Sequence, residues 1–103
     1  MTLQVGGLIW IACEVKPGPF SNERLVRIRS DFGEWVGFVE VESLREPITA
    51  GSTFIRATIT GVRGERFEVR LPGHPLTPNV FEGSVARVTP FGAVEAGHSA
   101  LHQ

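Results

Sequence analysis

The chain has 103 residues, of which 42% are apolar and 20% are charged, proportions typical of one globular domain and not of a disordered segment. Ten basic and eleven acidic side chains give a formal charge of −1, without the basic excess of proteins that bind nucleic acid mainly through phosphates. The single cysteine excludes an internal disulfide and fits a reducing compartment.

Short runs rich in Val, Ile, Phe, Trp and Thr lie between glycines and prolines, and helical periodicity is nearly absent. These runs predict six strands, at residues 7–15, 24–30, 34–42, 53–62, 65–71 and 79–89. Because successive side chains of a strand point to opposite faces, each run has an inward set. The predicted inward residues are Ile9, Ile11, Cys13, Val15, Val26, Ile28, Ile55, Ala57, Ile59, Phe67, Val69 and Leu71.

Turn-forming residues join these runs. The connections predicted are tight hairpins at 31–33 and 62–65 and proline-stiffened loops at 16–22 and 71–78. One helical turn is expected at 43–46, ended by Pro47. Gly83 is interpreted as a bulge or bend in the sixth strand.

We therefore expect a single all-β domain over residues 1–90 and a loosely ordered tail over 91–103. The two halves share a weak pattern, an aromatic residue followed by Gly and then Val at every second position, in 35–39 and again in 81–85. The halves are interpreted as possible pseudo-repeats, residues 5–47 and 48–90, that fold as one unit.

The run Trp35-Val36-Gly37-Phe38-Val39, followed by Glu40-Val41-Glu42-Ser43-Leu44, resembles part of an SH3-like barrel. In that family an aromatic strand, a Gly-hydrophobic-Val step and a one-turn helix follow one another. The resemblance implies a small antiparallel barrel, SH3-like or of the related OB type, with a two-layer sandwich as the alternative. The chain has no tyrosine, whereas peptide-binding SH3 grooves use tyrosines, so the resemblance implies architecture and not function.

No pattern predicts catalysis, a metal or a cofactor. His98 and His102 are four residues apart, but no cysteine or acidic residue stands near them at the spacing of a metal site. His74 is a weak candidate for a ligand site, if glutamates of neighbouring strands approach it. Cys13 falls on an apolar face and is expected to be a small buried hydrophobe.

Large aromatic and arginine side chains are the main surface candidates. Trp10 is predicted to point outward, and Trp35 and Phe38 lie on opposite faces of one strand, so both cannot belong to one core. The candidate binding surface consists of Trp10, Phe20, Trp35, Phe38, Arg27, Arg29, Arg56, Arg66 and Arg70.

Three functions are compatible with this surface. The first is a non-catalytic binding or assembly module that contacts a protein partner or a second copy of itself. The alternative is a barrel that binds single-stranded nucleic acid through aromatics and arginines, and the third is a small-molecule-binding barrel or small enzyme. The apolar stretch 8–12 is too short to span a bilayer and the N-terminus lacks a secretory signal, so we expect a cytoplasmic protein.

Overall fold

The structure, a computed structural model, describes residues 3–77, 81–89 and 92–95. Within these residues the regular elements are strands and two single turns of 3₁₀ helix, so the all-β prediction is confirmed. The strands are β1 (Leu8–Pro17), β2 (Glu23–Ser30), β3 (Gly33–Glu40), β4 (Ser52–Arg63), β5 (Arg66–Arg70), β6 (His74–Pro75), β7 (Phe81–Ser84) and β8 (Ala93–Val94). The 3₁₀ turns are η1 (Val41–Ser43) and η2 (Val85–Arg87).

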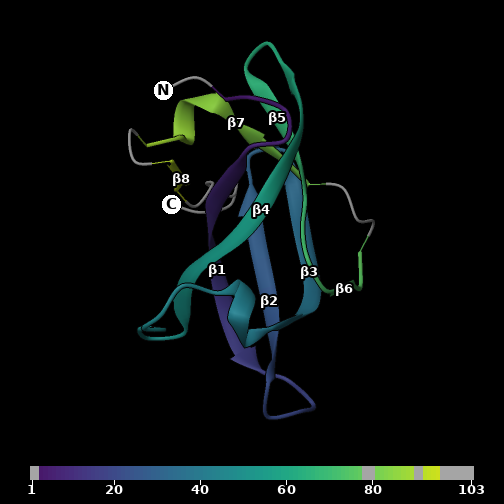
Figure 1. Cartoon of the computed structure of the whole chain (residues 1–103), viewed down its shortest axis with the longest axis vertical. Coiled ribbons are helices and arrows are strands. Elements are labelled where there is room, and N and C mark those ends of the chain that lie inside the picture. Colours follow the sequence, from purple (N-terminus) through teal and green to yellow (C-terminus); the bar gives the residue numbers. More distant parts are fainter. Residues whose placement is uncertain (1–2, 78–80, 90–91, 96–103) are drawn as a thin grey trace.

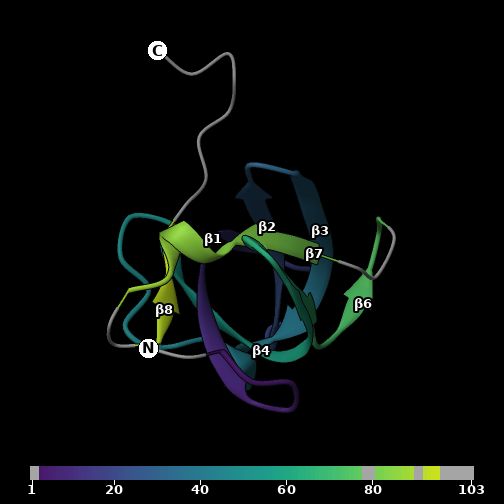
Figure 2. The same cartoon turned by 90° about the horizontal axis from the view of Figure 1, so that it is seen from above.

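The strands form one curled sheet in the order β6-β3-β2-β1-β4-β5-β7, with antiparallel neighbours throughout (Figure 1). β8 pairs with β1 in parallel, outside this order. Seen from above, the ribbons curl around a common interior (Figure 2). The hydroxyl of Ser30, at the end of β2, donates to the Glu82 carbonyl of β7 (2.7 Å) across the open side of the curl. The fold is therefore a half-barrel and not a two-layer sandwich.

The core lies inside the curl and consists of the side chains that alternation turns inward. Every residue of the predicted inward set is at most 8% exposed, which confirms the face assignments of the strands. Burying such aliphatic and aromatic groups stabilises the fold by about 1.5–3 kcal/mol for each fully covered side chain. The same core also contains Trp35, Val39, Leu44, Phe81 and Val94.

Gly83 is neither a bulge nor a bend, which corrects the interpretation of the sixth strand. It pairs in regular register with Phe67 of β5, and the ring of Phe67 covers it. A Cβ at this position would lie 2.5 Å from Phe67 Cζ, so the glycine is needed to seat the ring. The register shift of the sheet occurs instead in β4, between Ile59 and Gly61.

The third predicted strand is too long and the helical turn is displaced. β3 ends at Glu40 and η1 covers Val41–Ser43, because the Val41 amide leaves the β2–β3 ladder and donates to the Asn22 carbonyl (3.0 Å). The Leu44 amide then closes the turn on the Val41 carbonyl (3.0 Å), and Leu44 enters the core.

The sixth predicted strand is shorter than 79–89. Only Phe81–Ser84 is strand, and residues 79 and 80 lie outside the described residues. The Ser84 hydroxyl accepts from the Ala86 amide (3.3 Å), which turns the chain into η2 instead of continuing β7. The hydrogen bond between a serine side chain and a nearby backbone amide competes with the ladder hydrogen bonds that would extend the strand.

Two short strands occur where the sequence predicts irregular chain. β6 lies in the 71–78 loop and pairs with β3, and β8 lies at the start of the expected tail. A two-residue strand is too short for alternation to reveal it. The histidines of the tail, His98 and His102, lie outside the described residues.

The two halves follow the same order of elements. A long strand, a second strand, a glycine-containing strand and a 3₁₀ turn occur as β1-β2-β3-η1 and again as β4-β5-β7-η2, with the two-residue β6 inserted between β5 and β7. The residue after each turn bridges to a later strand, Leu44 to Ile55 and Val88 to Val94. A duplication of one half remains a prediction, because a shared order of elements also arises without one.

Candidate functional site

Trp35 does not belong to an exposed surface, which corrects its inclusion among the candidates. Its side chain is wholly buried, and its six-membered ring lies against Gly37, where an added Cβ would meet Trp35 Cη2 at 2.6 Å. The indole Nε1 is also buried and has no hydrogen-bond partner among the described residues. Trp35 is therefore a core residue, and Phe38, on the other face of β3, is the half-buried one.

Arg27 and Arg29 face outward from β2, as predicted, but acidic side chains neutralise them. Both reach the Glu34 carboxylate, at 3.6 Å and 3.5 Å, and Arg29 also lies 4.0 Å from Glu14. All four groups are nearly half exposed, so these pairs contribute little to stability. They leave the outer face of β2 and β3 with little net charge.

Arg66 is paired in a similar way at the β5–β7 edge. Its guanidinium lies 3.9 Å from the Phe32 ring centroid and 3.9 Å from the Glu82 carboxylate. Phe20 is 66% exposed in the β1–β2 loop, apart from the other aromatic candidates. The sheet therefore separates the predicted surface into several groups.

The remaining candidates, Trp10, Arg56 and Arg70, lie on one outer face. In the ladders Trp10 stands opposite Arg56, Leu8 opposite Thr58, and Thr58 opposite Arg70, so three neighbouring strands present these side chains together. We define the β1–β4–β5 face as Leu8, Trp10, Phe54, Arg56, Thr58 and Arg70, with Arg45 packed on it.

Arg45 is a member of this face that the sequence analysis missed. Its guanidinium carbon lies 4.7 Å from the Trp10 ring centroid and 5.4 Å from that of Phe54. The Arg45 amide donates to the Phe54 carbonyl (2.9 Å), and the Thr53 hydroxyl donates to the Arg45 carbonyl. These bonds hold the guanidinium over the two rings, an arrangement that stabilises the cation while it stays exposed. The only sequence signal for it is its position beside the apolar Leu44.

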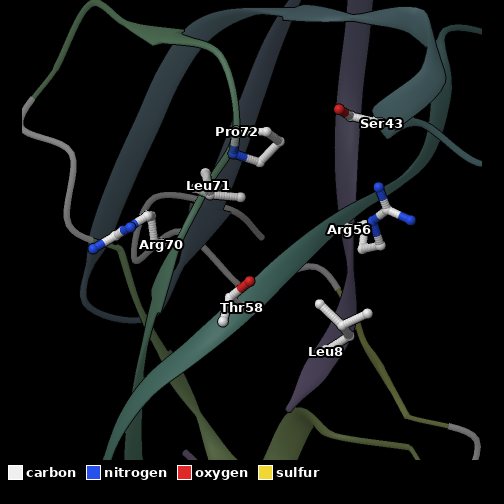
Figure 3. Close-up of a pocket in the computed structure, with 7 residues that line it drawn as sticks. All are labelled: Leu8, Ser43, Arg56, Thr58, Arg70, Leu71 and Pro72. Atoms are coloured by element: carbon white, nitrogen blue, oxygen red, sulfur yellow. The ribbon is translucent and has the colours of Figure 1, made fainter. Parts of the chain in front are cut away.

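A pocket of about 450 Å³ opens beside this face, between β4, η1 and the chain that follows β5 (Figure 3). Arg56 and Ser43 stand on one side of it, Leu71 and Pro72 on the other, with Thr58 below them in the view of Figure 3. The lining consists of Leu8, Ser43, Arg56, Thr58, Arg70, Leu71 and Pro72, and none of these residues is acidic.

The two arginines of the pocket are free of acidic partners within the described residues. Every ion pair found in that part of the chain involves other arginines, and both Arg56 and Arg70 are exposed. With Arg45 they form a local positive region in a protein whose formal charge is −1. Such a region can bind an anion because no carboxylate competes for the guanidinium groups.

The ladders do not pair His74 with the strands that carry the nearby glutamates of the prediction. It is exposed in β6, opposite Phe38 of β3, whereas Glu68 and Glu82 stand opposite each other on β5 and β7. No group of three or more His, Cys, Asp or Glu side chains able to hold a metal occurs among the described residues. Burial raises the pKa of the Cys13 thiol to about 12, so it is a poor nucleophile.

Comparison of the chain with protein-family models, with curated proteins and with solved structures finds no match. In the part of the chain that the structure describes, no helix has the length and apolar composition needed to cross a membrane.

Proposed function

We propose that the chain is a non-catalytic module that binds single-stranded nucleic acid through the β1–β4–β5 face. The observation that carries this proposal is a set of three arginines on this face: Arg45 over the rings of Trp10 and Phe54, Arg56 opposite Trp10, and Arg70 on the neighbouring strand β5. These arginines, Arg45, Arg56 and Arg70, form no ion pair within residues 3–77, 81–89 and 92–95. Proteins that bind single strands combine cations for the phosphates with flat groups on which bases stack.

The formal charge of −1 does not oppose this proposal, because the charges are unevenly distributed. Four other arginines, Arg27, Arg29, Arg66 and Arg87, stand beside carboxylates, and two hydrogen bonds of 3.1 Å join Arg87 to Asp31. Glu68 lies two residues from Arg70 on the same side of β5, but it accepts a hydrogen bond from Thr60 (2.9 Å) and forms no ion pair with Arg45, Arg56 or Arg70. Binding depends on the local potential more than on the total charge.

The number of arginines on the β1–β4–β5 face sets the expected strength. Three phosphate contacts are few beside the six to ten of strong DNA-binding proteins, so we expect weak binding with a modest dependence on salt. Stacking adds about 1–3 kcal/mol per base where an aromatic or guanidinium plane is accessible. The flat group on which a base can stack is the guanidinium of Arg45, which already covers Trp10.

The test is fluorescence anisotropy with short labelled single-stranded DNA and RNA at low and at physiological salt. We expect the double variant Arg56→Gln/Arg70→Gln to bind at least tenfold more weakly, since removing a hydrogen bond to a charged group costs about 1.5 kcal/mol or more. The matched control is Arg27→Gln/Arg29→Gln, which removes the same charge from the neutralised β2 face and should change affinity little. Absence of any salt-sensitive binding by the unaltered protein would refute the proposal.

A protein partner, including a second copy of the chain, is the second candidate function. Among the described residues, four large apolar side chains are more than 60% exposed and favour it: Val5, Leu8, Phe20 and Leu76. Burial of Trp35 and the cover of Arg45 over Trp10 weaken it, because the largest aromatics are not left bare. Light scattering over a range of concentrations tests self-association. If the protein is a dimer and the substitution Phe20→Ser or Leu8→Ser dissociates it, the result supports self-association as the function. A monomer at every concentration eliminates the homodimer.

A further inference from the structure

The pocket beside the β1–β4–β5 face has the chemistry of an anion site. Its polar groups are the Arg56 guanidinium and the hydroxyls of Ser43 and Thr58, and Arg70 stands at its far edge beyond Leu71 (Figure 3). These groups come from η1, β4 and β5. The arrangement of these elements, and not a single flexible loop, therefore brings the groups together. All are hydrogen-bond donors, and the described residues that line the pocket include no acidic one.

We infer that this pocket is a binding site for one phosphate group of a nucleotide. The inference deepens the proposed function, on which it rests for the source of the phosphate. It assigns Arg56 as the principal cation and Ser43 and Thr58 as neutral donors. Arg70 is a second cation at the edge, and because its side chain is directed away from Arg56 in Figure 3, it must change rotamer to contact the phosphate.

Donor number and direction favour phosphate over carboxylate. A guanidinium offers five N–H donors and each hydroxyl one more, and here they approach from different elements. A tetrahedral anion with several acceptor oxygens can use donors from separate directions, whereas a planar carboxylate is satisfied by one bidentate arginine. The donor set therefore exceeds what one carboxylate needs.

The size and the remaining walls of the pocket favour a nucleotide over a bare ion. A volume of about 450 Å³ falls within the usual range of small-molecule sites and leaves space beyond one phosphate. Leu71 and Pro72 face Arg56 across this space, and Leu8 lies at its other end (Figure 3). These apolar walls can contact the sugar or base attached to the phosphate.

The position of the pocket fits a polymer that crosses the face. Arg56 belongs both to the pocket and to the row shared with Trp10, beside which Arg45 is stacked. A phosphate in the pocket would thus place the next nucleotide toward the Arg45–Trp10 stack. The pocket then fixes where a single strand begins its contact with the sheet.

The experiment follows backbone amide resonances of the full chain by NMR during titration, first with inorganic phosphate and then with adenosine 5′-monophosphate. We expect shifts at Ser43, Arg56, Thr58 and Leu71 with both probes, and tighter binding of the nucleotide. Arg56→Gln should weaken both at least tenfold, the loss expected when one charge-assisted hydrogen bond is removed. The matched control, Arg63→Gln, removes an exposed arginine next to the β4–β5 turn and should leave the affinities unchanged.

The outcomes separate this inference from the proposed function. Shifts at the pocket with phosphate, without any binding of oligonucleotides, would keep the phosphate site and reject the nucleic-acid function. Oligonucleotide binding that leaves the pocket resonances unmoved would keep the function and overturn the site. A short polyglutamate peptide that shifts the same resonances as strongly as phosphate would also overturn the inference, because the pocket would then select carboxylates.

Discussion

At the scale of single residues, two glycines determine how the aromatic core is seated. Gly37 lies under Trp35 and Gly83 lies under Phe67, and both aromatic side chains are at most 1% exposed. Neither glycine has a positive φ, so the requirement is for space and not for backbone freedom. The sequence shows both glycines, but it does not reveal which ring covers each one.

This arrangement predicts that Gly83→Ala destabilises the protein by about 1–3 kcal/mol, the usual cost of forcing extra volume into a packed core. The added methyl group would meet the Phe67 ring at 2.5–3.2 Å. Gly61→Ala is the control, because its Cβ would find no atom nearer than 3.9 Å. Urea denaturation measures both variants, and equal stability of the two would contradict the packing argument.

Cys13 gives a residue-scale prediction about pH. Burial raises its thiol pKa from 9.0 to about 12, so between pH 9 and 10 the unfolded chain loses this proton while the native protein keeps it. The free energy of unfolding must therefore fall as pH rises, by about 1 kcal/mol over this unit. The chain has no tyrosine, so no phenol titrates in this range.

Urea denaturation at both pH values measures the effect, and Cys13→Ala is the control. The variant removes the thiol, so its free energy of unfolding should change much less between the two pH values. An equal fall in the variant and the unaltered protein would show that another group is responsible.

At the scale of elements, the alternation of apolar and polar residues predicts the strands and their buried faces. Hydrogen bonds at the strand ends limit how well it predicts where each strand stops. β1, β2, β4 and β5 are long enough for inward and outward residues to be assigned, and the assignments are confirmed there. The errors fall at strand ends, where Val41 bonds to Asn22 and where Ser84 caps η2. The first bond depends on a tertiary contact and the second on one hydroxyl group. The alternation of apolar and polar residues reveals neither.

The same limit applies to the candidate site. Outward orientation of Trp10, Arg56 and Arg70 follows from alternation, but their grouping depends on β1 pairing with β4 across an intervening hairpin. The pocket also needs Ser43 and Pro72, which belong to a turn and a loop. Side chains on a strand could thus be placed from the sequence, whereas the register between distant strands could not.

β8 provides the prediction at this scale. Val94 is 4% exposed and packs in the core, although its segment was expected to be a loose tail. Val94→Ala should cost about 2 kcal/mol, the transfer energy of its methyl groups plus a cavity term. Val62→Ala, at a side chain that is 43% exposed, removes the same atoms and should cost far less. Thermal unfolding compares them, and a neutral Val94 variant would mean that β8 does not hold the half-barrel together.

At the scale of the whole molecule, charge is divided between neutralised and free regions. Arg27, Arg29, Arg66 and Arg87 each stand beside a carboxylate. The arginines of the β1–β4–β5 face do not, as far as the described residues extend, so a protein with a formal charge of −1 still presents unpaired arginines beside its pocket. The net charge is therefore a poor guide to the partners of this chain, and the measurable consequence is a salt dependence set by the arginines of this face.

The salt dependence has an expected size. The logarithm of the affinity for a single strand falls against the logarithm of salt concentration with a slope of about −0.7 per phosphate contact, so three arginines give about −2. Arg56→Gln/Arg70→Gln leaves one cation and predicts a slope of about −0.7. Anisotropy titrations over a range of sodium chloride concentrations measure both. Each phosphate that an arginine neutralises releases counterions, wherever the arginine stands in the fold. A slope of about −2 retained by the variant would therefore mean that cations outside the β1–β4–β5 face contact the phosphates. A slope of zero in the unaltered protein would mean that no cation of the protein contacts a phosphate.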